Sequence, residues 1–434
     1  MISMGTVMAM DMGTAIMKPD NEQPFFCTIK PSSRIGVLIV AMVFATLSAA
    51  ATLGVILKAR APAEAIEIFP TNGYAFGFLG ADYLEVGNDG QTLRVRDPQL
   101  LAQIARAGLE KEITDHRSVT NLALAKEYIK PTEAQKLYKT ALQMTRRSIL
   151  SHLYFIRKGA EQEDFELTLN HVSYLLRTEP ETRQTMVPFL VSLMSYEKSL
   201  EPLARLLNAQ GPWTDQFWQT AAQDSNQLTN LVILRNLLPP SSPSIKRRND
   251  EFIAEALANN HKFDAAWDFA QANFGDMPQQ ADGQLLRNYS FDKRSRYRPF
   301  DWKVFSTANQ VVTLDENNGN LAVSRFRGPG GPIASQLVRT PVPSVRLSAD
   351  IAIYGDGEWV LAGLDVLLLC ASKGAQQVIV SVPLSELAEQ RTIDIRIPAG
   401  CSNSLLILNG EAYDSERAAD LIVQKISLMD ASAE

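Results

Sequence analysis

Residues 35–57 read IGVLIVAMVFATLSAAATLGVIL, a segment without a charged residue that lies between Arg34 and Lys58. At a rise of about 1.5 Å per residue, a helix over this segment is roughly 35 Å long, enough to cross the ~30 Å hydrocarbon core of a bilayer. The segment therefore predicts one transmembrane helix that contacts membrane lipid. We interpret residues 1–34, which lack helical or strand periodicity, as a disordered cytoplasmic tail.

A cleaved signal peptide is the alternative interpretation of this segment. Ala59–Ala61 and Ala61–Ala63 have small residues at the spacing of a cleavage site. The apolar region of a signal peptide is only about 7–15 residues long, and here it is longer and follows a long tail. We therefore expect the segment to remain as an uncleaved anchor.

The balance of charge argues against one class of function. The chain has 434 residues, with 42 Lys and Arg against 48 Asp and Glu, and a net charge of −6. Nucleic-acid binding depends on a basic surface that neutralises phosphates, so this composition gives it no electrostatic support. The chain beyond residue 57 is long enough for two domains with cores of their own.

Residues 65–274 have helical periodicity and predict a helical repeat domain. Asp97-Pro98 is a capping residue followed by a proline at the first helical position, and apolar residues then recur at spacings of three and four. Leucine pairs recur at a spacing of 31 residues, at Leu175-Leu176, Leu206-Leu207 and Leu237-Leu238. This period, with two helices per repeat, is typical of tetratricopeptide-like α-solenoids, which bind protein partners on a concave surface. The alternative is a rigid spacer.

Residues 285–434 change to a period of two, after a predicted linker over residues 275–284. Val345, Leu347 and Ile351 belong to one apolar–polar alternation, and Ile393 and Ile395 belong to another. Short segments of this kind, separated by Gly, Pro and Asn, predict an antiparallel β-sandwich, most simply a jelly roll. The fold class expected for the whole chain is therefore multidomain α + β, with one transmembrane helix, a tetratricopeptide-like α-solenoid and a β-sandwich.

Four segments carry a resemblance to a known kind of protein: FPTNGYAFGFL, NYSFDKRSRYRPFDWKV, LDVLLLCAS and PAGCSNSLLIL, which start at residues 69, 288, 364 and 398. With them the chain resembles uncharacterised bacterial single-pass envelope proteins that combine a tetratricopeptide-like helical domain with a C-terminal carbohydrate-binding-like jelly roll. The resemblance implies a location in the bacterial inner membrane with most of the chain in the periplasm. It transfers no catalytic residue, binding residue or cofactor.

Cysteine placement predicts one disulfide. Cys370 ends an apolar strand candidate and Cys401 precedes another, whereas Cys27 lies on the other side of the predicted anchor. Two cysteines at strand ends of one sandwich pair readily in an oxidising compartment, so we expect a Cys370–Cys401 bond and hence a periplasmic location for the large part. The alternative is two buried thiols.

Aromatic side chains beside turns are the candidate glycan-binding residues. Tyr354 and Trp359 flank the turn GDGE, and Tyr297 lies within the basic segment KRSRYR, residues 293–298. An aromatic ring offers a large, stiff apolar surface against which a sugar ring can pack. Core burial of Trp359 and a solvated loop for residues 293–298 are the alternatives.

No catalytic, metal or cofactor motif is evident in the sequence. Phosphate-binding glycine loops and the nucleophile elbow are absent, and the four histidines are scattered over the helical half. Asp315–Asn320 is either a hairpin turn or an oxygen-rich calcium loop. We therefore expect a non-enzymatic protein whose helical repeats bind protein and whose sandwich binds polysaccharide. The alternatives are an assembly scaffold without glycan binding, or a glycan-active enzyme that uses clustered carboxylates such as Asp356, Glu358 and Asp365.

Overall fold

The computed structural model describes residues 31–86, 93–209, 211–242, 244–275, 283–354, 361, 363–372, 375–415 and 418–431. It divides into two compact units, residues 1–148 and residues 149–434, each taken by itself below. The predicted tail up to residue 30, which includes Cys27, and residues 276–282 of the predicted linker lie outside the described residues.

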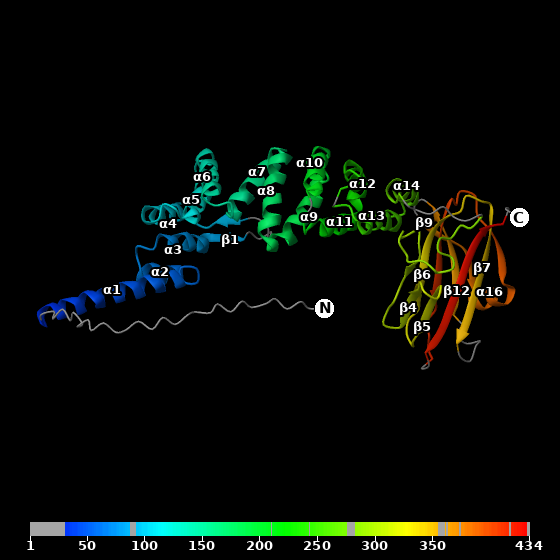
Figure 1. Ribbon diagram of the computed structural model, residues 1–434. Helices are drawn as coiled ribbons and strands as arrows, with labels where there is room; N and C mark the ends of the chain where they lie inside the picture. The colour runs from blue at the N-terminus through cyan, green and yellow to red at the C-terminus, as the bar shows by residue number, and fades with distance from the viewer. Residues whose placement is uncertain are drawn as a thin grey trace, which may run out of the picture. The chain divides into compact units, whose positions relative to one another are not determined.

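The first unit is built from helices and one short β-ribbon (Figure 1). Its elements are α1 (Pro31–Leu57), α2 (Pro62–Ile68), α3 (Gly73–Leu79), the 3₁₀ helix η1 (Gly80–Tyr83), β1 (Leu84–Val86), β2 (Leu93–Val95), α4 (Pro98–Lys111), α5 (His116–Glu127) and α6 (Pro131–Met144). Asp97 caps α4 as predicted, because its carboxylate accepts from the backbone N–H groups of Gln99 and Leu100.

Helix α1 contains the whole uncharged segment but begins earlier than predicted, at Pro31, a residue well suited to a first helical position. From Ala41 onward its side chains are mostly exposed, including Met42 (70%) and Phe44 (68%). Among the helices in the described part of the chain, none combines the length and the apolar character needed to cross a membrane.

Two glycines of the segment FPTNGYAFGFL, Gly73 and Gly77, allow helix α3 to pack closely against its neighbours. Helix α3 turns Gly73 and Gly77 towards the α4–α5 hairpin, and a Cβ atom at Gly77 would lie 2.2 Å from the Asp115 carboxylate. The side-chain amide of Asn121 on α5 donates to the carbonyl oxygen of Gly77 at 2.9 Å. The backbone of α3 can approach the α4–α5 hairpin this closely only because its facing residues are glycines. The segment FPTNGYAFGFL therefore serves helix packing.

The second unit begins with four helical hairpins. Their helices are α7 (Ile149–Glu161), α8 (Phe165–Thr178), α9 (Arg183–Leu193), α10 (Glu197–Asn208), α11 (Thr214–Gln223), α12 (Leu228–Leu237), α13 (Arg247–Asn259) and α14 (Phe263–Asn273), with 3₁₀ turns η2 (Pro180–Thr182) and η3 (Ser225–Gln227). Alternate helices pack together, α8 on α10 and α10 on α12, and likewise α9 on α11 and α11 on α13. The prediction of two helices per repeat is confirmed, with a leucine pair at the end of α8, α10 and α12.

Core aromatics hold the hairpins together. Trp213, Phe217, Trp218 and Trp267 are all buried in one hydrophobic cluster that runs along the hairpins. These rings therefore form part of the core that the hairpins share.

The C-terminal part of the second unit consists of two five-stranded antiparallel sheets around a shared core, called the sandwich below. The first sheet has the order β10-β7-β12-β5-β4 and the second β3-β6-β11-β8-β9. The strands are β3 (Lys303–Val304), β4 (Gln310–Asp315), β5 (Asn320–Arg325), β6 (Gly331–Arg339), β7 (Ser344–Tyr354), β8 (Leu364–Ser372), β9 (Ala375–Pro383), β10 (Thr392–Arg396), β11 (Asn403–Gly410) and β12 (Ala419–Asp430), with helix α16 (Leu384–Gln390) between β9 and β10. Val345, Leu347 and Ile395 are buried, as the period of two predicts.

Helices α13 and α14 share a core with the second sheet. The cluster that contains Trp267 also contains Phe300 and Leu337 of the C-terminal part. Polar contacts surround this core: the amide of Asn403 donates to Asp264 at 2.9 Å, and Arg298 pairs with Glu251 at 3.4 Å. The helical hairpins and the sandwich therefore belong to one packed body.

Candidate functional site

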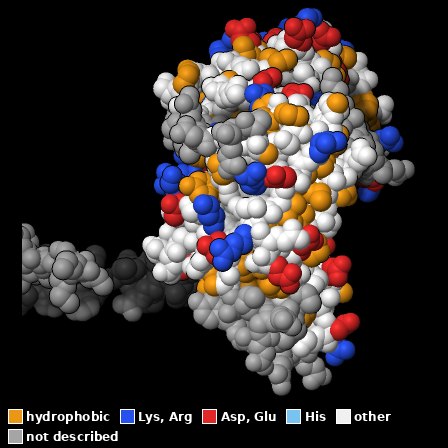
Figure 2. Space-filling view, turned by 90° about the vertical axis from the view of Figure 1, so that its right-hand side faces the viewer, with side chains coloured by type: hydrophobic (Ala, Val, Ile, Leu, Met, Phe, Trp, Pro, Cys, Tyr) orange, Lys and Arg blue, Asp and Glu red, His pale blue; other side chains and the backbone are white. Residues whose placement is uncertain are grey.

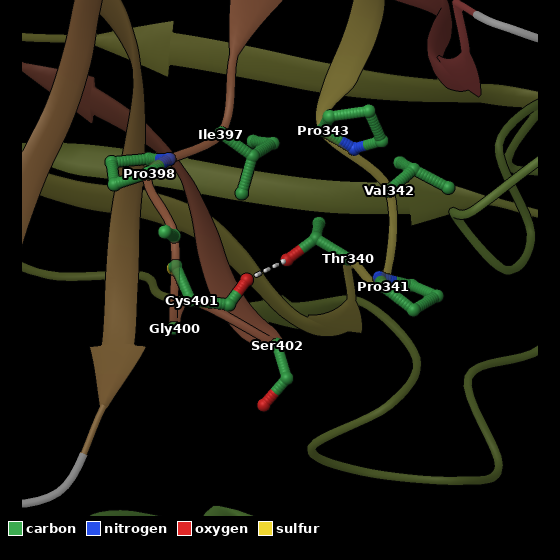
Figure 3. A pocket seen from close by; sticks show the side chains of 10 residues that line it. Thr340, Pro341, Val342, Pro343, Ile397, Pro398, Gly400, Cys401 and Ser402 are labelled. Atoms are coloured by element: carbon green, nitrogen blue, oxygen red, sulfur yellow. Dashed lines mark hydrogen bonds between the residues drawn. The ribbon is translucent and has the colours of Figure 1, made fainter.

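A pocket of about 400 Å³ opens at one end of the sandwich (Figure 3). Two loops form it, residues 340–343 between β6 and β7 and residues 397–402 between β10 and β11. Both loops cross from one sheet to the other, so the pocket lies where the two sheets are joined. This size is within the usual range for a ligand site.

Hydrogen bonds and the disulfide hold the two loops in place. The backbone N–H of Thr340 donates to the carbonyl of Ser402 at 2.9 Å, and that of Ile397 donates to the carbonyl of Pro343 at 2.9 Å. The Thr340 hydroxyl donates to the carbonyl of Cys401 at 3.2 Å, as Figure 3 shows. Cys401 is bonded to Cys370 of β8, with 5.5 Å between their Cα atoms. The predicted disulfide is confirmed, and it fixes one wall of the pocket.

The lining of this pocket is uncharged. It consists of Thr340, Pro341, Val342, Pro343, Ile397, Pro398, Ala399, Gly400, Cys401 and Ser402. Three prolines make the walls stiff, because the pyrrolidine ring fixes φ. None of these ten side chains ionises near neutral pH, since Cys401 is in the disulfide. The pocket therefore suits an uncharged group with an apolar surface, and its lining offers no side chain for acid–base chemistry.

Tyr297 is buried rather than presented to a sugar. Its side chain is 8% exposed, and the guanidinium carbon of Arg247 on α13 lies 4.4 Å from its ring centroid. The neighbouring Arg298 pairs with Glu251 and Glu255 on α13. This burial gives no support to the prediction that Tyr297 binds glycan. Tyr297 and Arg298 instead contact α13 and join the sandwich to the helices.

Of the other two candidate glycan residues, Tyr354 lies at the opposite end of β7 from the pocket. Tyr354 is the last residue of β7, opposite Asp420 in the register, and its side chain lies outside the described residues. Trp359 lies outside them altogether, as do the carboxylates Asp356 and Glu358. Asp365 is on β8, where its carboxylate accepts from the Ser381 hydroxyl at 3.1 Å.

The segment Asp315–Asn320 forms the turn between β4 and β5. The Asp315 carboxylate accepts from the backbone N–H of Asn317 at 3.1 Å and from that of Asn318 at 3.2 Å. The Asn318 side chain also donates to it and lowers the pKa of Asp315. The hairpin interpretation therefore holds. In the described parts of the chain, no three His, Cys, Asp or Glu residues are grouped to hold a metal ion.

The structure brings together two histidines that the sequence analysis treated as scattered. The Nδ1 atoms of His152 on α7 and His171 on α8 lie 2.8 Å apart. The His152 ring stacks on Tyr174 and the His171 ring on Phe155. Burial, with a further contribution from His152, lowers the pKa of His171 to about 4. Residues 149–161 and 165–178 are two helices joined by a short turn. Placing them side by side as a hairpin would have indicated that His152 and His171 lie close together.

Helix α12 exposes apolar side chains. Ile233 is 44% exposed and Leu237, one turn further, is 47% exposed. The leucine at the same place in the first repeat, Leu175, is 1% exposed. The leucine at this position of the repeat is therefore buried in α8 but exposed in α12.

No protein family model matches this chain, and a search of curated proteins finds no match.

Proposed function

We propose that this protein is a single-pass envelope protein of the bacterial inner membrane and acts as a non-enzymatic assembly scaffold. Helix α1 would be the anchor, the hairpins α7–α14 a tetratricopeptide-like α-solenoid, and the sandwich a jelly roll. The resemblance to bacterial envelope proteins and the uncharged segment of α1 support this location. The Cys370–Cys401 bond supports an oxidising compartment for the sandwich.

The exposed pair Ile233 and Leu237 carries the proposal of a protein partner on the helical repeats. Two large apolar side chains on adjacent turns of one helix form a patch, and the next exposed residues along the chain, Pro239 and Pro240, are apolar as well. An apolar patch on a repeat stack is typical of a protein-binding surface, because covering it removes apolar area from water. The partner's contacting side chains would be apolar.

The shared core between hairpins and sandwich supports a scaffold. Because Trp267 and Phe300 belong to one cluster, a partner bound on α12 would be held in a defined orientation relative to the sandwich. The face shown in Figure 2 carries both acidic and basic side chains, with hydrophobic ones between them. Such a mixed surface does not favour a polyanion as its partner.

The experiment is site-specific photocrosslinking in the source cell. A photoreactive amino acid at Ile233 should form an adduct with a protein of the envelope. Leu237→Asp should reduce the yield of this adduct several-fold, because it places a charge in the apolar contact. Asn236→Asp adds the same charge one residue away and is the matched control. Equal yields in both variants would contradict binding at this patch.

Glycan binding by the sandwich is the second candidate, supported by the resemblance and by the two-sheet fold. With Tyr297 buried, the remaining candidates for such a site are Tyr354, at the end of β7, and Trp359. Trp359→Ala in the full chain should weaken retention on an envelope polysaccharide without lowering the melting temperature. Release of reducing ends from that polysaccharide would instead favour the glycan-active enzyme.

A further inference from the structure

The chain folds back along the C-terminal end of α1. Helix α2 packs on α1, and a Cβ atom at Gly54 would lie 3.0 Å from the Cβ atom of Phe69. The side-chain amide of Asn72 donates to the carbonyl oxygen of Gly54 at 3.0 Å. The residues around Phe69 and Asn72 therefore lie at the same height along α1 as Gly54.

Two polar contacts join the region of the turn between α4 and α5 to the segment 70–74, which follows Phe69. The ammonium group of Lys111 donates to the carbonyl oxygen of Pro70 at 2.6 Å. The hydroxyl groups of Tyr74 and Thr114 lie 3.3 Å apart. Ile113 lies between Lys111 and Thr114 in this turn, so it is next to the segment that contacts α1.

Large apolar side chains are exposed in this region. Ile113 is 79% exposed, Ile68 is 41% exposed and Tyr74 is 37% exposed. We call Ile68, Pro70, Tyr74, Lys111 and Ile113 the juxtamembrane surface. An isoleucine with this exposure at the tip of a turn has almost no protein contact, although burying it would remove apolar area from water.

Two lysine ammonium groups lie close to aromatic rings in this region. The ammonium nitrogen of Lys58, just after α1, lies 5.3 Å from the Tyr74 ring centroid. The ammonium nitrogen of Lys111 lies 5.5 Å from the Phe76 ring centroid. Tyrosine and lysine are side chains with an apolar body and a polar tip, and both are suited to the boundary between hydrocarbon and water.

We propose that the juxtamembrane surface lies in the lipid headgroup layer, with Ile113 inserted towards the acyl chains. This inference rests on the proposed anchor. Residues 35–54 of a helix cover about 30 Å, the thickness of the hydrocarbon core, so Gly54 lies at the boundary. Phe69, Asn72 and the turn with Ile113 are held near Gly54. The lipid surface is the occupant because this surface lies beside the C-terminal turns of α1, where Val55 and Ile56 are also exposed apolar side chains.

The inference places a second membrane contact beside the anchor. A single helix can rotate and tilt, whereas a helix with a packed, lipid-inserted surface beside it is held at one angle. The first unit would then have a fixed orientation on the bilayer.

The test measures the depth of nitroxide labels on the full chain in phosphatidylcholine vesicles. Cys27→Ser removes the third cysteine of the chain, and Cys370 and Cys401 are bonded to each other. Single cysteines are then introduced by Ile113→Cys, Ile129→Cys and Phe44→Cys. Ile129 is the matched control, because it is an isoleucine, 52% exposed, in the turn at the other end of α5. Circular dichroism checks that each labelled variant keeps its helix content.

We expect the label at residue 113 to be accessible to oxygen and protected from a water-soluble nickel complex. Its ratio of oxygen to nickel accessibility should be roughly tenfold that at residue 129, because oxygen partitions into the apolar layer and the polar complex does not. The label at residue 44 should be deeper still.

Three results would overturn the proposal in distinguishable ways. If residues 113 and 129 have the same ratio while residue 44 is deep, the surface is not inserted but the anchor stands. If residue 44 is accessible to the nickel complex, the anchor itself is wrong. If residue 113 is protected from both reagents, the surface is covered by protein, such as a second copy of the chain.

Discussion

The rings of Trp267 on α14 and Phe300, which precedes β3, have centroids 4.2 Å apart at the centre of the contact between helices and sandwich. Both side chains are buried, at 5% and 0% exposure. Phe300→Ala should lower the free energy of unfolding by about 3–5 kcal/mol, through lost apolar burial and the cavity that remains. Phe326→Ala, at a phenylalanine that is 42% exposed, is the control and should change stability little. Similar melting temperatures for the two variants would contradict the importance of this contact.

A buried ion pair connects α12 and α13. The guanidinium of Arg235 donates to both carboxylate oxygens of Asp250, at 2.6 and 3.0 Å. Burial raises the pKa of Asp250 against the opposing effect of Arg235. Arg235→Ala should destabilise the protein by about 3–5 kcal/mol, because it leaves a carboxylate buried without its partner. Lys198→Gln, which breaks an exposed ion pair with Glu163, should cause no measurable change in denaturant unfolding.

The His152–His171 contact predicts a loss of stability in acid. The pKa of His171 is lowered from 6.5 to about 4 by burial and by His152, so the unfolded chain binds a proton at higher pH than the folded chain. Stability from this group is therefore complete above about pH 6.5 and is lost as the pH falls towards 4. Melting temperatures over this range should depend less on pH in His171→Phe.

His261→Asn is the control for this pH series. His261 lies at a positive φ of 57°, a conformation that asparagine also adopts. This variant should keep the pH dependence of the native protein. If His171→Phe keeps it as well, the acid sensitivity comes from other groups.

The disulfide should stabilise the folded protein and should also hold the pocket loop 397–402 in place. The Cys370→Ala/Cys401→Ala double variant should lose roughly 3–4 kcal/mol in the chain-entropy model, given a separation of 31 residues. It should also loosen the loop 397–402, which hydrogen exchange of that segment can measure. Non-reducing peptide mapping of protein extracted directly from cells should find the bond. Two freely alkylated thiols would contradict it.

Topology is tested by protease added to spheroplasts. If the proposed orientation is correct, residues 58–434 lie outside the cytoplasmic membrane and should be degraded while the membrane is intact. A cytoplasmic marker protein should survive as the control. Large fragments that persist until the membrane is lysed would show the opposite orientation.

Much of the local structure followed from the sequence. The helical hairpins were predictable because their apolar residues recur at three and four, and the strands because theirs recur at two. Asp97 capped its helix as expected, since a cap depends only on neighbouring residues. The Cys370–Cys401 bond was predictable because each cysteine is next to an apolar strand candidate; in the structure Cys370 lies near the end of β8 and Cys401 just before β11.

The environment of each candidate site residue depends on tertiary contacts, which the sequence pattern does not contain. Tyr297 looks exposed within a basic segment, but Arg247, fifty positions earlier, packs over its ring. His152 and His171 have no motif in common and meet only because α7 and α8 form a hairpin.

The sequence by itself determined which half of the chain is helical and which is built mainly of strands, and it favoured the Cys370–Cys401 pair, because these depend on period and local chemistry. Only the tertiary structure decided that Thr340 and Ile397 line one pocket and that Leu237 is exposed while Leu175 is buried. It also decided that the turn with Ile113 lies next to the segment that contacts α1. Each of these depends on which distant elements pack together, and packing is decided by the shapes of whole surfaces rather than by neighbours along the chain.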